Sequence, residues 1–220
     1  FTENGEAVTA ETVFTPETPN GTVTVSFTFD SRLIKENTSL VVFETLYKDG
    51  KELAVHADIN DNGQTVKVKV PEIGTKATVD GKKEVTASGR VKIEDIVSYK
   101  NLTPGKEYAV KGVLMNKATG EPLLADGKEI RSSFTFKPDK PDGEINITFV
   151  FDASGLKTAT EIVIFETLYR DGTEIAAHAD LKDEGQTVKI TPPTPDNPQT
   201  GDNSNLGFWI GLGAVALGGL

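Results

Sequence analysis

The chain has 220 residues, of which 33 are Asp or Glu and 23 are Lys or Arg, so its net charge at neutral pH is −10. An acidic surface repels the phosphate backbone of nucleic acids, and no basic cluster offsets this charge, so we expect no nucleic-acid partner. The chain has no cysteine and only two histidines, which excludes disulfides and thiolate metal sites, and we expect neither a bound metal nor a cofactor.

A block of sequence occurs twice, with a constant offset of 122 residues between the copies. The first copy contains Val42-Phe43-Glu44-Thr45-Leu46-Tyr47, His56 and Gly63-Gln64-Thr65, and the second contains Ile164-Phe165-Glu166-Thr167-Leu168-Tyr169, His178 and Gly185-Gln186-Thr187. A fixed period of this size predicts tandem domains. The repeated Glu, His and Gln are polar, and the packing of a core does not by itself require them.

The repeat divides the chain into four parts. Residues 1–70 correspond to the C-terminal part of an incomplete repeat, and residues 71–191 form a complete one. Residues 192–205 are a Pro-rich linker, which we expect to be extended, and residues 206–220 are apolar. Since about 20 apolar residues are needed to cross a bilayer, we interpret this last segment as a truncated transmembrane helix. The chain starts in mid-repeat without a signal peptide, and we interpret it as a fragment of a longer protein.

Within the repeats the hydrophobic period is two, which is typical of β-strands. In chain order we expect strands at 22–29, at 66–70, around Thr75, at 91–99, at 162–168 and at 186–190. Three Asp-Gly pairs are typical of hairpin turns, at positions 49–50, 80–81 and 171–172. Short strands separated by turns, without a helical period, predict an all-β protein of tandem immunoglobulin-like β-sandwiches.

Alternation along a strand also predicts which side chains of residues 71–191 face the core. Four polar residues share a face with apolar ones: Thr75 with Ile73, Ala77 and Val79, Asp95 with Val91, Ile93, Val97 and Tyr99, Glu166 with Ile162, Ile164 and Leu168, and Gln186 with Val188 and Ile190. Buried polar groups are costly unless they are paired, so we expect these four residues to meet one another.

Such a set can carry out a specific reaction. A hydroxyl group becomes a nucleophile when a base takes its proton. Two carboxyl groups in an apolar pocket cannot both ionise cheaply, so at least one is expected to be protonated at neutral pH. That carboxyl can hydrogen-bond an amide and supply a proton to departing ammonia. With a nearby His as a base, the expected product is an ester between Thr75 and Gln186 that forms once.

The Phe-Glu block, the His-x-Asp motif and the Gln-Thr pair eight residues after the His resemble the VaFE-repeat, or Thr–Gln ester-bond, domains of Gram-positive surface proteins. The resemblance covers residues 1–70 and 71–191. It implies an intramolecular ester between Thr75 and Gln186, promoted by Asp95, Glu166 and His178. In the first repeat it assigns Glu44, His56 and Gln64 to an incomplete site, whose Thr and Asp would precede Phe1.

The pentapeptide Asn197-Pro198-Gln199-Thr200-Gly201, followed by the apolar segment, resembles a sortase sorting signal, in which cleavage between Thr and Gly joins the Thr to a cell-wall amine. Asn197 stands where Leu is usual, which leaves the sortase class open. These resemblances imply a secreted adhesin or pilin-like stalk that is held briefly in the membrane and then anchored to the cell wall. The expected partners are sortase, peptidoglycan, the membrane, and a host or surface ligand bound by an upstream head domain.

Several alternatives compete with this hypothesis. The repeats could bind a ligand or glycan without a cross-link, although the only Trp, Trp209, lies in the apolar segment. A hydrolase built around Thr75 is disfavoured because the facing Gln would consume the nucleophile. Lys76 could form an isopeptide bond with an Asn, but its predicted face points outward, whereas Thr78 could replace Thr75 if the register of the strand slips. Four acidic residues are expected to form turns, with a calcium site as the lesser alternative: Asp58, Asp61, Asp180 and Asp183.

Overall fold

A computed structural model describes residues 1–194 of the protein. These residues contain no α-helix and two 3₁₀ turns, η1 (Ser31–Leu33) and η2 (Ala153–Gly155). The strands before Pro71 are β1 (Thr2–Glu3), β2 (Glu6–Ala7), β3 (Thr38–Val41), β4 (Glu44–Lys48), β5 (Lys51–His56) and β6 (Thr65–Val68). The strands after it are β7 (Glu72–Val79), β8 (Glu84–Thr86), β9 (Arg90–Lys100), β10 (Tyr108–Asn116), β11 (Leu124–Ala125), β12 (Lys128–Glu129), β13 (Arg131–Phe136), β14 (Gly143–Asp152), β15 (Thr160–Arg170), β16 (Thr173–His178) and β17 (Thr187–Thr191). The predicted all-β fold is confirmed.

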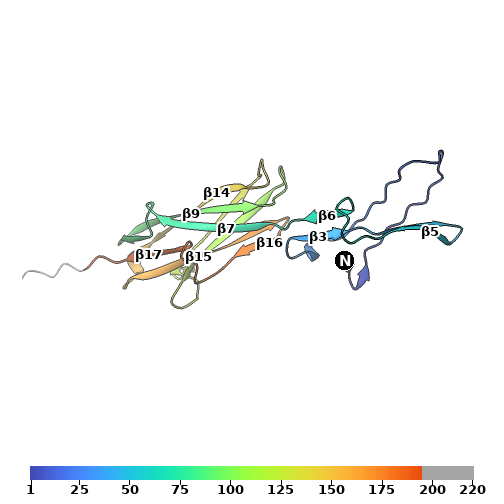
Figure 1. The fold of residues 1–220 in the computed structure, drawn as a ribbon. Helices are drawn as coiled ribbons and strands as arrows, with labels where there is room; N and C mark the ends of the chain where they lie inside the picture. Colours follow the sequence, from blue (N-terminus) through green and yellow to red (C-terminus); the bar gives the residue numbers. More distant parts are fainter. Residues whose placement is uncertain (195–220) are drawn as a thin grey trace, which may run out of the picture.

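Most of the strands from β7 to β17 form a sandwich of two sheets (Figure 1), whereas β11 and β12 pair only with each other in a separate hairpin. One sheet has the order β14-β9-β7 and is antiparallel. The other has the order β13-β10-β15-β17-β8, with β16 also paired to β15, and its β17–β8 pair is parallel. Strands β7 and β17 therefore belong to different sheets, although each lies at one end of the repeat in sequence.

The core lies between these sheets and is built by the alternation seen in the sequence. On β9, Val91, Ile93 and Val97 are buried while Lys92 and Lys100 are exposed. Ile162, Ile164 and Leu168 of β15 are fully buried, and so are Val188 and Ile190 of β17. Each fully buried side chain of this size contributes about 1.5–3 kcal/mol relative to an exposed one. Three polar residues lie in the same core with no exposed surface: Asp95, Glu166 and Gln186.

The three Asp-Gly pairs form the predicted turns. In each pair both residues have positive φ, as in Asp171 (φ 50°) and Gly172 (φ 75°) between β15 and β16. Such turns match the right-handed twist of paired strands. The turn at Asp80–Gly81 reverses the chain after β7 and brings Lys82 back to pair with Val79. It thereby places the following residues beside β17.

The first repeat is less complete, and one strand predicted in it is absent. Residues 22–29 form no strand, so that prediction was wrong. The equivalent residues of the second repeat belong to β14, which is paired along its length with β9. The described chain contains no counterpart of β9 for residues 22–29, so their backbone groups have no ladder to join. Strand propensity alone does not form a sheet.

The two repeats follow one another in line, because β6 runs into β7 at the end of the sandwich (Figure 1). The junction is held by two Asn side chains. Val70 N–H donates to Asn37 Oδ1 at 2.9 Å, and Asn101 Nδ2 donates to the Val70 carbonyl at 2.9 Å. The chain thus enters the sandwich at β7 and leaves it after β17, at the opposite end.

Candidate functional site

The predicted site residues come from both sheets of the sandwich. Thr75 lies on β7 and Asp95 on β9, where Ala77 pairs with Asp95, so the two side chains are on the same face. Glu166 of β15 pairs directly with His178 of β16. Directly paired residues of antiparallel strands project to the same side with Cβ atoms about 5 Å apart, so His178 lies beside Glu166.

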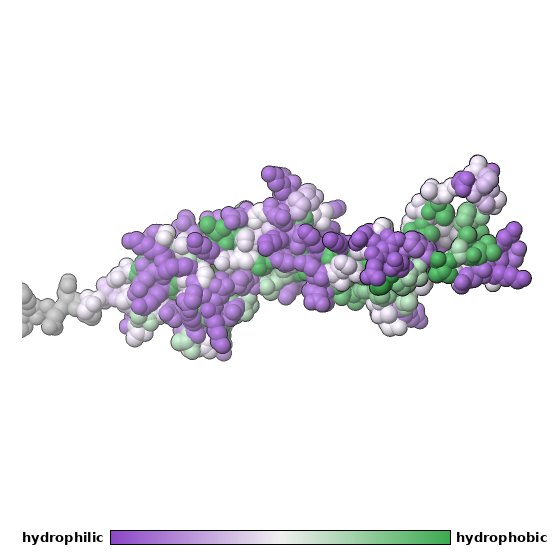
Figure 2. Space-filling model, in the orientation of Figure 1, coloured by the Kyte–Doolittle hydropathy of each residue, from purple (hydrophilic) through white to green (hydrophobic). Residues whose placement is uncertain are grey.

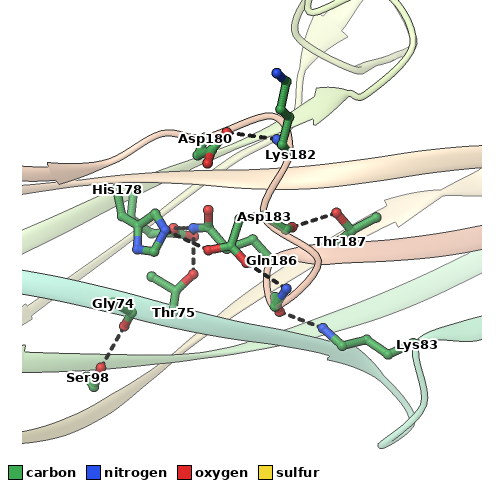
Figure 3. A network of polar contacts seen from close by, with 12 residues as sticks. Gly74, Thr75, Lys83, Ser98, His178, Asp180, Lys182, Asp183, Gln186 and Thr187 are labelled. Carbon is green, nitrogen blue, oxygen red and sulfur yellow. Dashed lines mark hydrogen bonds and ion pairs between the residues drawn. The ribbon is translucent and has the colours of Figure 1, made fainter.

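The carboxamide of Gln186 lies between the two sheets, just before β17 (Figure 3). Its Nε2 donates to Thr75 Oγ1 at 2.6 Å and to Glu166 Oε2 at 2.7 Å. Gln186 and Glu166 are fully buried, and Thr75 is half-buried. Within residues 1–194, no donor reaches Gln186 Oε1. The amide carbonyl is therefore free to accept a proton or a hydrogen bond from an acid.

Asp95 and Glu166 form a buried pair of carboxyl groups. Burial raises the pKa of Asp95, and a hydrogen bond to Glu166 opposes this rise. Burial raises the pKa of Glu166 far above its ordinary value, and the hydrogen bond and charge of Asp95 raise it further. Weaker opposing effects on the two pKa values come from the Lys76 backbone N–H at Asp95 and from the Thr75 and Gln186 side chains at Glu166. A hydrogen bond between two carboxyls requires a proton on one of them, so the pair holds a proton at neutral pH.

His178 forms a second pair at the edge of this site, which sequence reasoning did not foresee. Its Nε2 lies 2.8 Å from Asp183 Oδ2. Asp183 also accepts the Gly185 N–H through Oδ1 at 2.6 Å. Burial opposes the ionisation of Asp183, but the hydrogen bonds from Gly185 and His178 outweigh it and lower the pKa of this carboxyl. The carboxylate is therefore ionised beside the imidazole at neutral pH.

Asp183 is thus a turn residue, as predicted, with a further role. Asp58, Asp61 and Asp180 also accept a backbone N–H two residues ahead. Only Asp61 and Asp183 face a histidine in addition. The signal in the sequence was the spacing His-x₄-Asp-x₂-Gln, which both repeats share. Among residues 1–194, no group of three or more His, Asp or Glu has a geometry that could hold a metal ion.

The first repeat contains equivalents of two contacts of this site, the one between Gln186 and Glu166 and the one between His178 and Asp183. Gln64 Nε2 donates to Glu44 Oε2 at 2.6 Å, and His56 Nε2 lies 2.9 Å from Asp61 Oδ2. Here Glu44 and His56 are exposed. No hydroxyl side chain of residues 1–194 takes the place that Thr75 has beside Gln186.

The structure distinguishes Thr75 from Thr78 and Lys76, the two alternative residues on the same strand. Thr78, which pairs with Glu94 at the far end of β7, lies one residue out of phase with the inward face. Lys76 is exposed, as its alternation with Thr75 predicted. The sorting motif at 197–201 and the apolar segment at 206–220 lie outside the described residues. Within residues 1–194 there is no helix of the length and apolar character that a membrane span requires.

The fold and the site define a class: a β-sandwich in which a hydroxyl, a carboxamide and two carboxyls are packed together in the core. The chain belongs to the family of T-Q ester bond containing domains, whose sequence profile matches residues 2–68 and 71–190. The predicted resemblance is therefore confirmed at the level of the family. Comparison with curated proteins gave no match.

Solved structures with a similar fold include two crystal forms of an adhesin from Mobiluncus mulieris, described as containing intramolecular disulfide, isopeptide and ester bond cross-links. The first is 21% identical, with a TM-score of 0.49, over 57% of this chain and 58% of that chain. The second is 20% identical, with a TM-score of 0.45 over the same shares. A glycosyl hydrolase family 2 member from Bacteroides cellulosilyticus is 12% identical, with a TM-score of 0.39, over 58% of this chain and 16% of that chain. Likeness at this level says nothing of function.

Proposed function

We propose that residues 71–191 form one covalent ester between Thr75 and Gln186 without turnover of any external substrate. The observation that carries this proposal is the 2.6 Å contact between Thr75 Oγ1 and Gln186 Nε2 inside a carboxyl-lined core. In the reaction Thr75 Oγ1 loses its proton and bonds to Cδ of Gln186. The bond from Cδ to Nε2 breaks, and the nitrogen leaves as ammonia.

The surrounding groups have the chemistry that each step needs. The proton held by Asp95 and Glu166 can polarise the Gln186 carbonyl and stabilise the charge that develops on it. Glu166 Oε2, at 2.7 Å from Nε2, is placed to pass a proton to the departing nitrogen. We assign His178, oriented by Asp183 at 2.8 Å, as the base that takes the Thr75 proton, by the same logic as other base-activated hydroxyls.

Intact-mass measurement of the purified chain tests this directly. The wild-type chain should weigh one ammonia less than its sequence, and Thr75→Ala and Gln186→Ala should each restore the full mass. Glu166→Ala should slow or stop the loss. Thr78→Ala is the matched control and should lose ammonia as the wild type does. Hydroxylamine at mildly alkaline pH should open the bond, because esters react with it where amides resist. A folded wild-type chain that keeps its full mass on long incubation would overturn the proposal.

We further propose that the first repeat is one half of an ester domain. Leu46 is 43% exposed, whereas its equivalent Leu168 is fully buried, and Val66 is 55% exposed, whereas Val188 is fully buried. In the second repeat these positions are covered by the sheet of β7, β9 and β14. Figure 2 shows apolar surface gathered over the N-terminal part of the chain, whereas the sandwich is mostly hydrophilic on the same face. A sheet carrying a Thr and an Asp would cover this surface and complete the site at Gln64.

The setting that best explains such repeats is a stalk on the bacterial cell surface. We propose that the protein is an adhesin or pilin-like stalk, that sortase cleaves between Thr200 and Gly201, and that the new carboxyl end is joined to peptidoglycan. Its support is the family assignment together with the order of repeat, Pro-rich linker, sorting motif and apolar segment. The absence of cysteine fits as well, since an ester would take the place of the disulfides that stabilise many extracellular domains.

A further inference from the structure

The carbonyl of Gly185 accepts two hydrogen bonds, one from β7, the strand that carries Thr75, and one from the turn that follows β7. Ala77 N–H of β7 donates to it at 3.0 Å, and Lys83 Nζ donates to it at 2.5 Å. The backbone carbonyl of Lys83 also accepts the Lys189 N–H at 2.7 Å. Lys83 is therefore bound to the chain on both sides of Gln186. Its side chain contacts the residue before Gln186, as Figure 3 shows, and its backbone contacts Lys189 after it.

The Gly185 carbonyl lies between two contacts of the site, the one between Gln186 and Thr75 and the one between Asp183 and His178. Gly185 precedes Gln186 directly, so the position of its peptide group determines where the carboxamide is placed. Its N–H donates to Asp183 at 2.6 Å, and Asp183 contacts His178 at 2.8 Å. The loop also passes close to β7, because a Cβ on Gly185 would lie 3.6 Å from the Thr75 carbonyl.

The side chain of Lys83 is exposed as a whole, but its ammonium group lies in a partly desolvated position beside the loop. Partial burial and the charge of Lys76 lower the pKa of Lys83, while the charges of Asp183 and Asp95 oppose this change. The hydrogen bond to the Gly185 carbonyl is charge-assisted, and such bonds are stronger than those between neutral groups. The contact thus draws the loop before β17 onto the turn after β7.

We propose that Lys83 is a positioning residue for the cross-linking reaction: it clamps the Gly185 carbonyl and so holds the Gln186 carboxamide against the Thr75 hydroxyl. This inference rests on the proposed ester. Lys83 touches neither reacting group and exchanges no proton with them. Without its ammonium group the Gly185 carbonyl keeps only the Ala77 N–H, and the loop gains freedom to move. Since displacements on the order of 1 Å can slow an oriented reaction about a hundredfold, ester formation should be about ten- to a hundredfold slower.

The test is the rate of ammonia loss in the full chain. Protein that has never folded is taken from inclusion bodies in urea and diluted into buffer at neutral pH. Folding is followed by circular dichroism, and ester formation by intact mass in samples quenched with acid. The variants are Lys83→Met, which keeps the length of the side chain, and Lys83→Arg, which keeps the charge. Lys82→Met is the matched control in the same turn, since Lys82 is exposed like Lys83 but it is Lys83 Nζ that contacts the Gly185 carbonyl.

We expect Lys83→Met to fold and then lose ammonia about ten- to a hundredfold more slowly than the wild type, Lys83→Arg to recover most of the rate, and Lys82→Met to match the wild type. To test whether Lys83 only stabilises the fold, the thermal midpoint of Thr75→Ala is compared with that of Thr75→Ala/Lys83→Met. Neither of these variants can cross-link. If the thermal midpoints of these two agree while the rates differ, Lys83 acts on the reaction. A wild-type rate in folded Lys83→Met would overturn this inference and leave the ester intact, whereas a wild-type chain that loses no ammonia would overturn the ester itself.

Discussion

Under tension, the Thr75→Ala variant should lengthen far more than the wild-type domain. Force that enters through residues 71–74 reaches Thr75 on β7, and force that leaves through the linker passes along β17 from Gln186. In Figure 1 these two strands connect to the chain at opposite ends of the sandwich. With the ester in place, the load passes from Thr75 directly to Gln186. The strands between them then carry little of it.

The size of the effect follows from the sequence separation of the bonded residues. Thr75 and Gln186 are 111 residues apart, and an extended chain spans about 3.3–3.6 Å per residue. Unfolding of a domain without the ester should therefore release about 370–400 Å of contour length. Almost none of this length is offset by the folded state, because Thr75 Oγ1 and Gln186 Nε2 are only 2.6 Å apart.

Single-molecule pulling on residues 71–194 between two handles measures this release. The wild-type domain should show no unfolding step of this length at forces that unfold the Thr75→Ala variant in one. Thr78→Ala, which removes a neighbouring hydroxyl on the same strand, should behave like the wild type. A wild-type step as long as that of Thr75→Ala, in molecules whose mass shows that ammonia has been lost, would mean that the load does not pass through Thr75 and Gln186.

The other predictions concern stability, pH, the first repeat and anchoring. Closure of a loop of 111 residues stabilises by about 5 kcal/mol in the chain-entropy treatment, so Thr75→Ala should lower the thermal midpoint of a domain of this size by about 20 °C, and calorimetry should find no comparable shift for Thr78→Ala. In the Thr75→Ala background, folded Glu166 keeps a proton that the unfolded chain loses above its ordinary pKa of 4.5. Stability should therefore fall between about pH 5 and pH 8, by at most about 1.4 kcal/mol per pH unit, and adding Glu166→Gln should flatten this slope. Tandem mass spectrometry should find Gln64 as a free amide in this chain, and a cross-link from it to any other residue of the chain would refute the half-domain proposal. In a host with a matching sortase, Thr200→Ala should move the protein from the wall to the membrane or the medium. Unchanged wall attachment of this variant would refute the proposal that sortase anchors the protein.

Period-two alternation correctly predicted which polar side chains face the core. It predicted that Asp95, Glu166 and Gln186 face the core, and all three are fully buried. It also favoured Thr75 over Thr78, and Thr75 is the residue that contacts Gln186. These predictions succeed because each strand presents one face to a single core, so that the position of one apolar neighbour determines the direction of the rest.

The same reasoning failed where structure depends on a partner strand or on a loop. Residues 22–29 alternate as clearly as any strand of the chain, yet they form none, because sheet formation requires hydrogen bonds to a neighbouring strand. Asp183 and Lys83 were not foreseen because they lie in a loop and a turn, where no periodicity indicates the direction of a side chain. Their contacts join residues brought together by the packing of the two sheets.

The sequence by itself determined the repeat, the all-β class and the set of inward polar residues, since these follow from spacing and from the alternation of polar and apolar side chains. Only the tertiary structure decided which of those residues meet. It brought Thr75 within 2.6 Å of a carboxamide that lies 111 residues away, paired His178 with Asp183 and placed Lys83 on the Gly185 carbonyl. The reason is that β7 and β17 belong to different sheets, and the distance between their side chains is set by how the sheets pack rather than by any local pattern.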